Sequence, residues 1–211
     1  TSALSSNFKA TNLHAAMPNY PERGDVAKAN AMLDAAGFAK NSDGVRLNGV
    51  LDIIPYGEDW RRAGEYLKQV MGDIGINLEL RYEDVPTWLK RVYHRYDFQM
   101  NVNYFYQLPD PVLGVHRHYG TDQIRKGTHF VNSSRYSNPT LDALLDSGAG
   151  EPDAAKRTAA YNEIQQILAN DMPVVNLFEL EFLVVYNNKL KGAYGSAMGA
   201  YGSFREAYLD D

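Results

Sequence analysis

The spacing of hydrophobic residues predicts a helix and then a strand near the start of the chain. Between residues 25 and 37 the apolar side chains recur every three or four positions, which is typical of one face of a helix. Asp25 can cap the first turn and Gly37 can end the last one, so we predict a helix over 26–36. Residues 45–53 then alternate between apolar and polar side chains, which predicts a strand.

The alternation of helix and strand continues through residue 106. An apolar stripe from Trp60 to Ile74 predicts a long amphipathic helix, and residues 76–82 alternate as a strand does. A short helix over 86–94 and a third strand over 98–106 follow. Helices in this position usually connect parallel strands by right-handed crossovers, so we expect a mainly parallel sheet.

Two helices and two apolar runs are predicted in the second half of the chain. Asn138 favours the start of one helix, and Pro152 favours the start of a longer one. The apolar runs at 174–178 and 182–186 have the length of buried strands. The predicted fold class is α/β, with a mixed, mainly parallel sheet flanked by helices.

Composition excludes several classes of function. A net charge of −5 and a pI near 5.5 provide no basic field for a phosphate backbone, so nucleic-acid binding is not expected. No stretch approaches the roughly 20 apolar residues of a membrane span. The absence of cysteine excludes disulfides and cysteine-ligated metals. Residues 1–8 do not resemble a signal peptide, so we expect that one was removed or that the chain is an internal fragment.

Short motifs recur along most of the chain, each weak alone but specific together in their order and spacing. The motifs are Asp25-x-x-Lys28-Ala29 with Ala36-Gly37-Phe38, Gly75-Ile76-Asn77-Leu78, Tyr96-Asp97-Phe98, Pro109-Asp110-Pro111, Asn132, Tyr136-Ser137-Asn138-Pro139, and Arg157-x-x-x-Tyr161 with Asp171-x-Pro173. Together they resemble the second half of the peptide- and nickel-type (family 5) solute-binding proteins of ABC importers.

The resemblance implies a two-lobed periplasmic-binding-protein-like fold that closes on its solute by hinge bending. It divides the chain into an N-terminal segment with a helix (1–44), an α/β ligand-binding lobe (45–172), and returning strands with a C-terminal tail (173–211). Nothing in the chain resembles the first half of the family, so we expect it to be part of a longer protein. The implied function is to bind a peptide or similar small solute and deliver it to ABC permease subunits.

The resemblance also implies where such a protein works and what it lacks. We expect a periplasmic protein, or one anchored by lipid to the outer face of the membrane. A monomer without cofactor, metal or catalytic activity is expected.

The segment that leaves the third predicted strand is the first place to look for a ligand, because ligands of α/β proteins gather at the carboxyl ends of strands. Alternation puts amide side chains on one face of this strand and apolar ones on the other. Amides suit a cleft that grips uncharged polar groups, although they could equally face solvent along an edge strand. The candidate ligand-binding residues are Asn101, Asn103, Tyr104, Phe105, Tyr106, Gln107 and Asp110.

Two of these residues are neutral where the resemblance implies charge. Peptide-binding members use an aspartate before the Asp-Pro pair to capture the ligand's ammonium group, and Gln107 occupies that position here. Asn101 stands where some members place an arginine that binds the carboxylate. We therefore expect a less charged solute, such as a sugar-containing, opine-like or blocked peptide compound.

Histidines provide a possible metal site. His116 and His118, together with His94 or His129, could in principle ligate a metal. A spacing of two residues matches no known site, so no metal site is predicted.

Two alternatives to solute binding remain open. Hydrolysis would require positioned carboxylates, and the available pairs, Asp110 with Asp122 and Glu179 with Glu181, lie in no recognisable motif. An interaction module without a small-molecule ligand would show a large exposed apolar patch and no cleft.

Overall fold

The computed structural model describes residues 3–6, 8, 24–108, 110–180, 183–194 and 202–210. Contacts divide the chain into two compact units, Ser2–Val175 and Asn176–Asp211. The first unit contains the three-stranded sheet and most of the helices.

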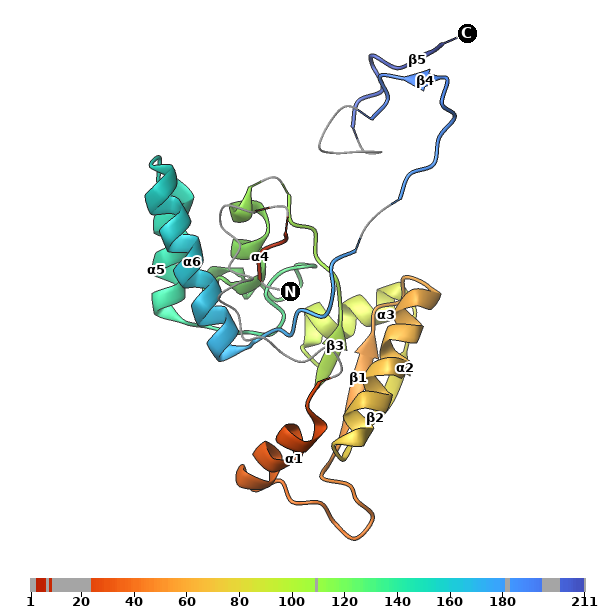
Figure 1. Cartoon of the computed structure of the whole chain (residues 1–211), viewed down its shortest axis with the longest axis vertical. Helices are drawn as coiled ribbons and strands as arrows, with labels where there is room; N and C mark the ends of the chain where they lie inside the picture. The colour runs from red at the N-terminus through yellow and green to blue at the C-terminus, as the bar shows by residue number, and fades with distance from the viewer. Residues whose placement is uncertain are drawn as a thin grey trace. The chain divides into compact units, whose positions relative to one another are not determined.

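The sheet of the first unit is parallel and has the strand order β2-β1-β3 (Figure 1). Its strands are β1 (Leu47–Ile53), β2 (Ile76–Tyr82) and β3 (Met100–Val102). Helix α2 (Glu58–Asp73) connects β1 to β2, as predicted for a crossover connection. The predicted α/β class with a mainly parallel sheet is confirmed.

Helix α2 covers one face of this sheet (Figure 1). Its amphipathic stripe packs Trp60, Leu67 and Met71 on the apolar row that contains Leu51 and Ile53 of β1. Burial of this stripe, rather than intrinsic helix propensity, supplies most of the stability of such a helix.

Strand β3 is shorter than the sequence predicts. The alternation favours a strand over 98–106, but the ladder with β1 ends at the pair Ile53 and Val102. The physical reason lies in the partner strand, because Pro55 follows β1 closely and has no N–H to continue a ladder. Residues 103–106 are therefore free to leave the sheet.

The remaining helices of the first unit surround this sheet or pack on each other. α1 (Val26–Ala35) begins at its predicted cap, Asp25. The predicted short helix consists of α3 (Val85–Leu89) and a π-helical turn, η1 (Lys90–Arg95). The sequence did not predict three short elements, which are η2 (Pro111–Leu113), α4 (Val115–Tyr119) and η3 (Thr121–Gln123).

Two long helices, α5 (Pro139–Gly150) and α6 (Ala154–Asp171), pack side by side (Figure 1). Asn138 caps α5 as predicted. The cap of α6 is Asp153, whose carboxylate accepts two backbone N–H groups. The helix therefore begins at Ala154, two positions after the predicted Pro152. Together these helices bury a core that includes Leu141, Leu145, Tyr161, Ile164 and Leu168.

The second unit contains a small antiparallel pair, β4 (Leu190–Lys191) and β5 (Tyr208–Leu209). The returning strands predicted at 174–178 and 182–186 are not formed by the described residues of those ranges, and Phe182 lies outside the described residues. A strand requires a neighbour for its backbone hydrogen bonds, and none of the described strands pairs with these runs. Many of their apolar side chains are exposed, Val185 to 95%.

Candidate functional site

The strand order creates a switch point at the carboxyl edge of the sheet. From the central strand β1 the chain passes through α2 to β2 on one side, and it then returns to β3 on the other side. The direction in which the chain crosses the sheet therefore reverses between β1 and β3. Open α/β sheets bind ligands at such a switch point, outside the carboxyl ends of the strands.

Four aromatic side chains meet at this edge, and we call them the aromatic cluster: Tyr56, Trp60, Tyr104 and Tyr106. Tyr56 follows β1, Trp60 lies in the first turn of α2, and the other two follow β3. The rings of Trp60 and Tyr104 are stacked, with centroids 5.3 Å apart and planes at 26°. Tyr56 and Tyr106 meet the Tyr104 ring at steep angles, with centroids at 5.8 Å and 5.3 Å.

The amides of β3 and the segment after it lie away from this cluster. Asn101 pairs across the sheet with Asp52, on the face opposite the apolar row. Asn103 donates a hydrogen bond of 2.6 Å to the hydroxyl of Tyr93. Burial raises the pKa of Tyr93 to about 12, so this hydroxyl stays neutral. The predicted alternation of amide and apolar faces is thus present over β3 itself, where Met100 and Val102 pack in the core and Asn101 does not, and it ends with the strand.

The next candidate residues contact other parts of the first unit. The Gln107 side chain accepts a hydrogen bond of 2.6 Å from the backbone N–H of Ser5 and donates one to the carbonyl of Ala3. The Phe105 ring packs on His118, with centroids 3.7 Å apart. Burial lowers the pKa of His118 to about 3, so its imidazole is neutral at physiological pH.

Asp110 is bonded within the chain as well. Its carboxylate accepts the backbone N–H of Val112 at 2.9 Å and binds Arg157 Nη2 at 2.7 and 2.9 Å. The hydrogen bond from Arg157 lowers the pKa of Asp110. The structure therefore brings Tyr104 and Tyr106 together at the switch point, and it places Phe105, Gln107 and Asp110 in separate contacts.

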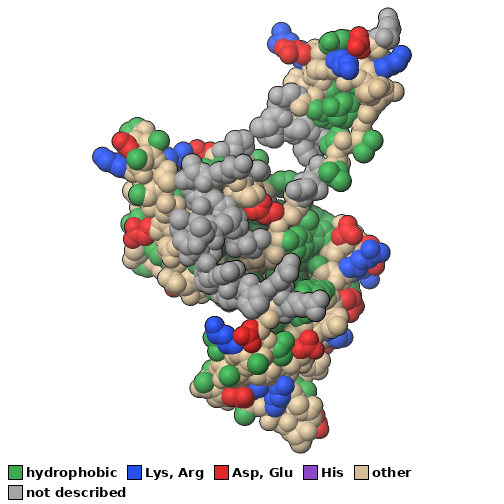
Figure 2. Space-filling model, in the orientation of Figure 1, with side chains coloured by type: hydrophobic (Ala, Val, Ile, Leu, Met, Phe, Trp, Pro, Cys, Tyr) green, Lys and Arg blue, Asp and Glu red, His purple; other side chains and the backbone are tan. Residues whose placement is uncertain are grey.

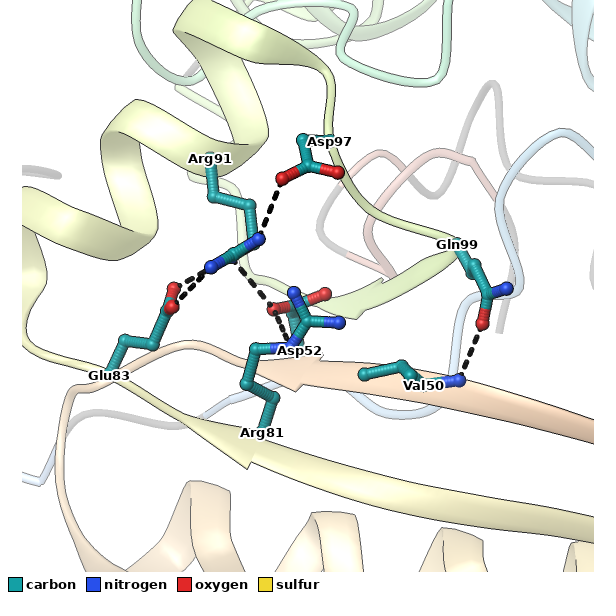
Figure 3. Close-up of polar contacts among 7 residues, drawn as sticks. All are labelled: Val50, Asp52, Arg81, Glu83, Arg91, Asp97 and Gln99. Carbon is teal, nitrogen blue, oxygen red and sulfur yellow. Dashed lines mark hydrogen bonds and ion pairs between the residues drawn. The ribbon is translucent and has the colours of Figure 1, made fainter.

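A network of charged residues lies beside Asn101 on the polar face of the sheet (Figure 3). Arg91 binds Glu83 through two hydrogen bonds of 2.6 and 2.9 Å and Asp97 through one of 2.8 Å. The Asp52 carboxylate lies 3.5 Å from Arg81 and 3.7 Å from Arg91.

Asp52 differs from its neighbours because its side chain is fully buried. Its oxygens have no hydrogen-bond partner among the described residues. Burial raises the pKa of Asp52, although Arg81 and Arg91 oppose the shift. Because the charges of the network are paired with one another, it presents little net charge to a solute.

A hollow of about 240 Å³ opens on the other side of β1, between the ends of β1 and β2. Arg61, Tyr82 and Glu83 are among its lining residues. The Arg61 guanidinium lies 4.4 Å above the Tyr82 ring, so these two side chains contact each other. We place the candidate site at the carboxyl ends of β1 and β3, because the switch point of the strand order and the aromatic cluster coincide there.

The histidines do not assemble the metal site considered above. His94 and His129 face each other with their Nε2 atoms 2.9 Å apart, whereas His118 is buried against Phe105. Within the described ranges, no three His, Cys, Asp or Glu side chains are grouped as metal ligands would be.

Sequence reasoning missed Tyr56 and Trp60 as site residues. The signal for Trp60 was read only as part of the apolar stripe of α2, and Tyr56 lies between Pro55 and Gly57 in the connection. An aromatic residue directly after a predicted strand of a parallel sheet could have marked Tyr56 as a candidate.

Acidic and basic side chains are interspersed over the described part of the face in Figure 2, without a large field of one sign. Among the described helices, none combines the length and apolar character needed to cross a membrane.

Comparison with known proteins gives consistent matches. The family model of bacterial extracellular solute-binding proteins, family 5 (middle part), matches residues 2–125. Protein XP55 of Streptomyces lividans is 27% identical over 173 residues, which are 80% of this chain and 31% of that protein. A probable D,D-dipeptide-binding periplasmic protein of Escherichia coli is 25% identical over 135 residues, covering 64% of this chain and 25% of that protein.

A solved structure agrees with these sequence matches. It is the mannohexaose-bound periplasmic oligopeptide-binding protein of Thermotoga maritima, with a TM-score of 0.62 and 25% identity. The match covers 72% of this chain and 31% of that chain. The chain thus spans about a third or less of the length of these relatives.

Proposed function

The chain belongs to the bacterial extracellular solute-binding proteins of family 5, and on this premise we propose that it forms part of the solute-binding component of an ABC importer. In this role it contributes one side of a site that holds a peptide or similar small solute for delivery to the permease. The other side of the site belongs to a further lobe of the whole protein. The proposal includes an extracytoplasmic location, a monomeric state and no catalytic activity.

The observation that carries this proposal is the aromatic cluster at the switch point of the sheet. Its rings come from segments that leave two adjacent parallel strands, which is where α/β folds place ligands. Aromatic side chains with a polar tip offer a solute both apolar area and a hydrogen bond. Of the candidate residues from the sequence, Tyr104 and Tyr106 lie in this cluster, and Asn101 lies on β3, the strand that precedes them.

We propose a solute of low net charge, peptide-like or sugar- or opine-like. Charged groups on the polar face of the sheet are paired within the chain, as in the contacts of Arg91 with Glu83 and with Asp97. Gln107 stands where the resemblance implies an ammonium-binding carboxylate, and its uncharged amide is bonded to Ala3 and Ser5. The relatives are compatible with either chemistry, since one is named for D,D-dipeptides and another holds mannohexaose.

The test is native mass spectrometry of the whole protein, purified gently from its natural source. We expect a stoichiometric bound small molecule, whose mass gives the class of solute. A retained free dipeptide would contradict the low-charge proposal while supporting solute binding. A protein that carries nothing, and whose melting temperature no solute in a broad panel raises, would refute solute binding.

Substitution of Gln107 tests the charge argument separately. Gln107→Asp should strengthen binding of free peptides about tenfold, because a carboxylate forms a charge-assisted hydrogen bond with an ammonium group. Gln107→Asn is the matched control, since it has the same length as aspartate, without the charge, and likewise shortens the reach to Ala3 and Ser5. Equal affinities of the two variants for free peptides would refute ammonium capture at this position.

A further inference from the structure

Two side chains of the aromatic cluster are partly exposed to solvent. Trp60 and Tyr104 stack on each other and pack against a buried core that includes Trp88 and Tyr93. Tyr56 and Tyr106, by contrast, are 40% and 49% exposed. An exposed aromatic residue is unremarkable alone, but these two flank the same buried ring at the edge where the sheet places its ligands.

The stacked pair holds both partly exposed rings in place from different segments. Tyr56 comes from the connection after β1 and Tyr106 from the segment after β3, and each meets the ring of Tyr104. Tyr104 is in turn fixed by Trp60 of α2, which is anchored on the sheet. Trp60 and Tyr104 are thus positioning residues, and Tyr56 and Tyr106 are the side chains that a solute can reach.

The chemistry of these two side chains matches a sugar ring. A tyrosine presents an apolar face and a hydroxyl that both donates and accepts hydrogen bonds. A pyranose has the same combination, with C–H groups on its face and hydroxyls around its rim. Arg91 of the charged network is paired with Glu83 and Asp97, so this arginine adds no free ionic group that would favour a charged solute.

We propose that Tyr56 and Tyr106 form a stacking subsite for a pyranose ring, so that the solute is a neutral saccharide or carries one. This inference rests on the proposed solute-binding function and names the class of solute. It assigns specificity to Tyr56, which lies outside the segment 101–110 that the sequence singled out.

Tryptophan fluorescence provides a direct readout of the subsite. This chain contributes two tryptophans, and Trp88 is 1% exposed. In a whole protein whose tryptophans outside this chain are replaced by phenylalanine, acrylamide therefore quenches mainly the partly buried Trp60. The whole protein is titrated with hexose oligosaccharides, including mannohexaose, and with blocked tripeptides with and without phenylalanine. We expect the oligosaccharides to bind and to protect Trp60 from acrylamide, and the blocked peptides to do neither.

Variants separate stacking from other contacts. Tyr56→Ala and Tyr106→Ala should each weaken oligosaccharide binding at least tenfold. Tyr56→Phe keeps the ring, so it should lower the affinity for the oligosaccharide less than Tyr56→Ala does. The matched control is Tyr66→Ala, a change of a 64% exposed tyrosine on α2 outside the cluster, which should change affinity less than twofold.

Each contrary outcome has a distinct meaning. Oligosaccharide binding that neither alanine variant weakens refutes the subsite and leaves the proposed function intact. Binding of the phenylalanine peptides without the oligosaccharides refutes the pyranose assignment. A whole protein that binds no solute in any assay overturns the proposed function, and the subsite with it.

Discussion

Arg157 of α6 binds Asp110, which lies 47 positions earlier in the chain, through one nitrogen that contacts both carboxylate oxygens at 2.7 and 2.9 Å. Asp110 also accepts the backbone N–H of Val112, so its carboxylate fixes the start of η2. The pair therefore ties the segment after β3 to the helical part of the first unit. This contact gives a structural role to Asp110 of the Pro-Asp-Pro motif and to Arg157 of the Arg-x-x-x-Tyr motif. Neither residue needs a ligand for that role.

The first prediction concerns the pH dependence of this pair. The hydrogen bond from Arg157 lowers the pKa of Asp110, so its contribution is present above the usual aspartate pKa and is lost as pH falls through the lowered value. Asp110→Asn should reduce the free energy of unfolding by about 0.5–1 kcal/mol at pH 7, a small effect because the Asp110 side chain is 42% exposed. Urea unfolding at pH 7 and pH 3 measures this loss of free energy of unfolding, which should be smaller at pH 3.

Asp122→Asn is the control for the Asp110 variant. Asp122 pairs with Arg125 at 3.5 Å, and both side chains are more than half exposed. We expect Asp122→Asn to change the free energy of unfolding by less than about 0.5 kcal/mol at either pH. A loss from Asp110→Asn that is the same at pH 3 and pH 7 would show that the ion pair is not its source.

The second prediction compares two glycines of α2. A Cβ at Gly64 would lie 2.6 Å from Cδ1 of Ile53, whereas a Cβ at Gly72 meets nothing within 4 Å. Alanine is favoured over glycine by about 1 kcal/mol in a helix interior, and overpacking costs about 1–3 kcal/mol. Gly72→Ala should therefore stabilise the protein by about 0.5–1 kcal/mol, and Gly64→Ala should destabilise it. Chemical unfolding of both variants provides the comparison, and equal stabilisation would refute close packing of α2 on β1.

Local patterns in the sequence predicted the elements that depend on local chemistry. The strand over 76–82 has the predicted bounds, because strict alternation follows a glycine at position 75 with a φ of 83° that ends α2. Asp25 and Asn138 cap their helices as predicted, because the side-chain oxygen and the backbone N–H that it accepts are close in sequence.

The features that the sequence did not predict depend on distant residues. The end of β3 is determined by its partner β1, and the aromatic cluster exists because strand order brings Tyr56 next to Tyr104. The amide of Gln107, a predicted ligand-binding residue, bonds with Ala3 and Ser5, about a hundred positions away, which the sequence did not predict. Such contacts leave no periodic signal, so they could be found only from the fold.

The third prediction concerns the attachment of α1. The Arg46 side chain is 2% exposed, and it donates hydrogen bonds to Asn30 and Asp34 of α1, to the carbonyl of Phe38 and to the carbonyl of Ile74. No residue of α1 is itself buried. Arg46→Ala should therefore raise hydrogen exchange in α1 at least tenfold and leave α6 unchanged. Arg62→Ala, which removes a 76% exposed arginine, is the control. Unchanged exchange in α1 would show that other contacts hold it.

The last prediction concerns the buried carboxylate of Asp52. Burial raises its pKa, so the folded protein keeps the proton to a higher pH than the unfolded chain does. This group therefore lowers the free energy of unfolding as pH rises from the usual aspartate pKa through the raised value. Asp52→Asn removes the charge and keeps the shape, while Arg91 retains Glu83 and Asp97 as partners.

We expect Asp52→Asn to be about 1 kcal/mol more stable than the natural chain at pH 7, because a neutral group of the same shape avoids desolvation of the carboxylate. The difference should narrow as pH falls to 4, and urea unfolding at several pH values measures it. Asp97→Asn alters an exposed partner of the same arginine and should change stability by less than about 0.5 kcal/mol. If Asp52→Asn instead destabilises the protein at pH 7 by about 2 kcal/mol or more, attraction to Arg81 and Arg91 outweighs the cost of burial, and Asp52 is an electrostatic anchor of the sheet rather than a strained charge.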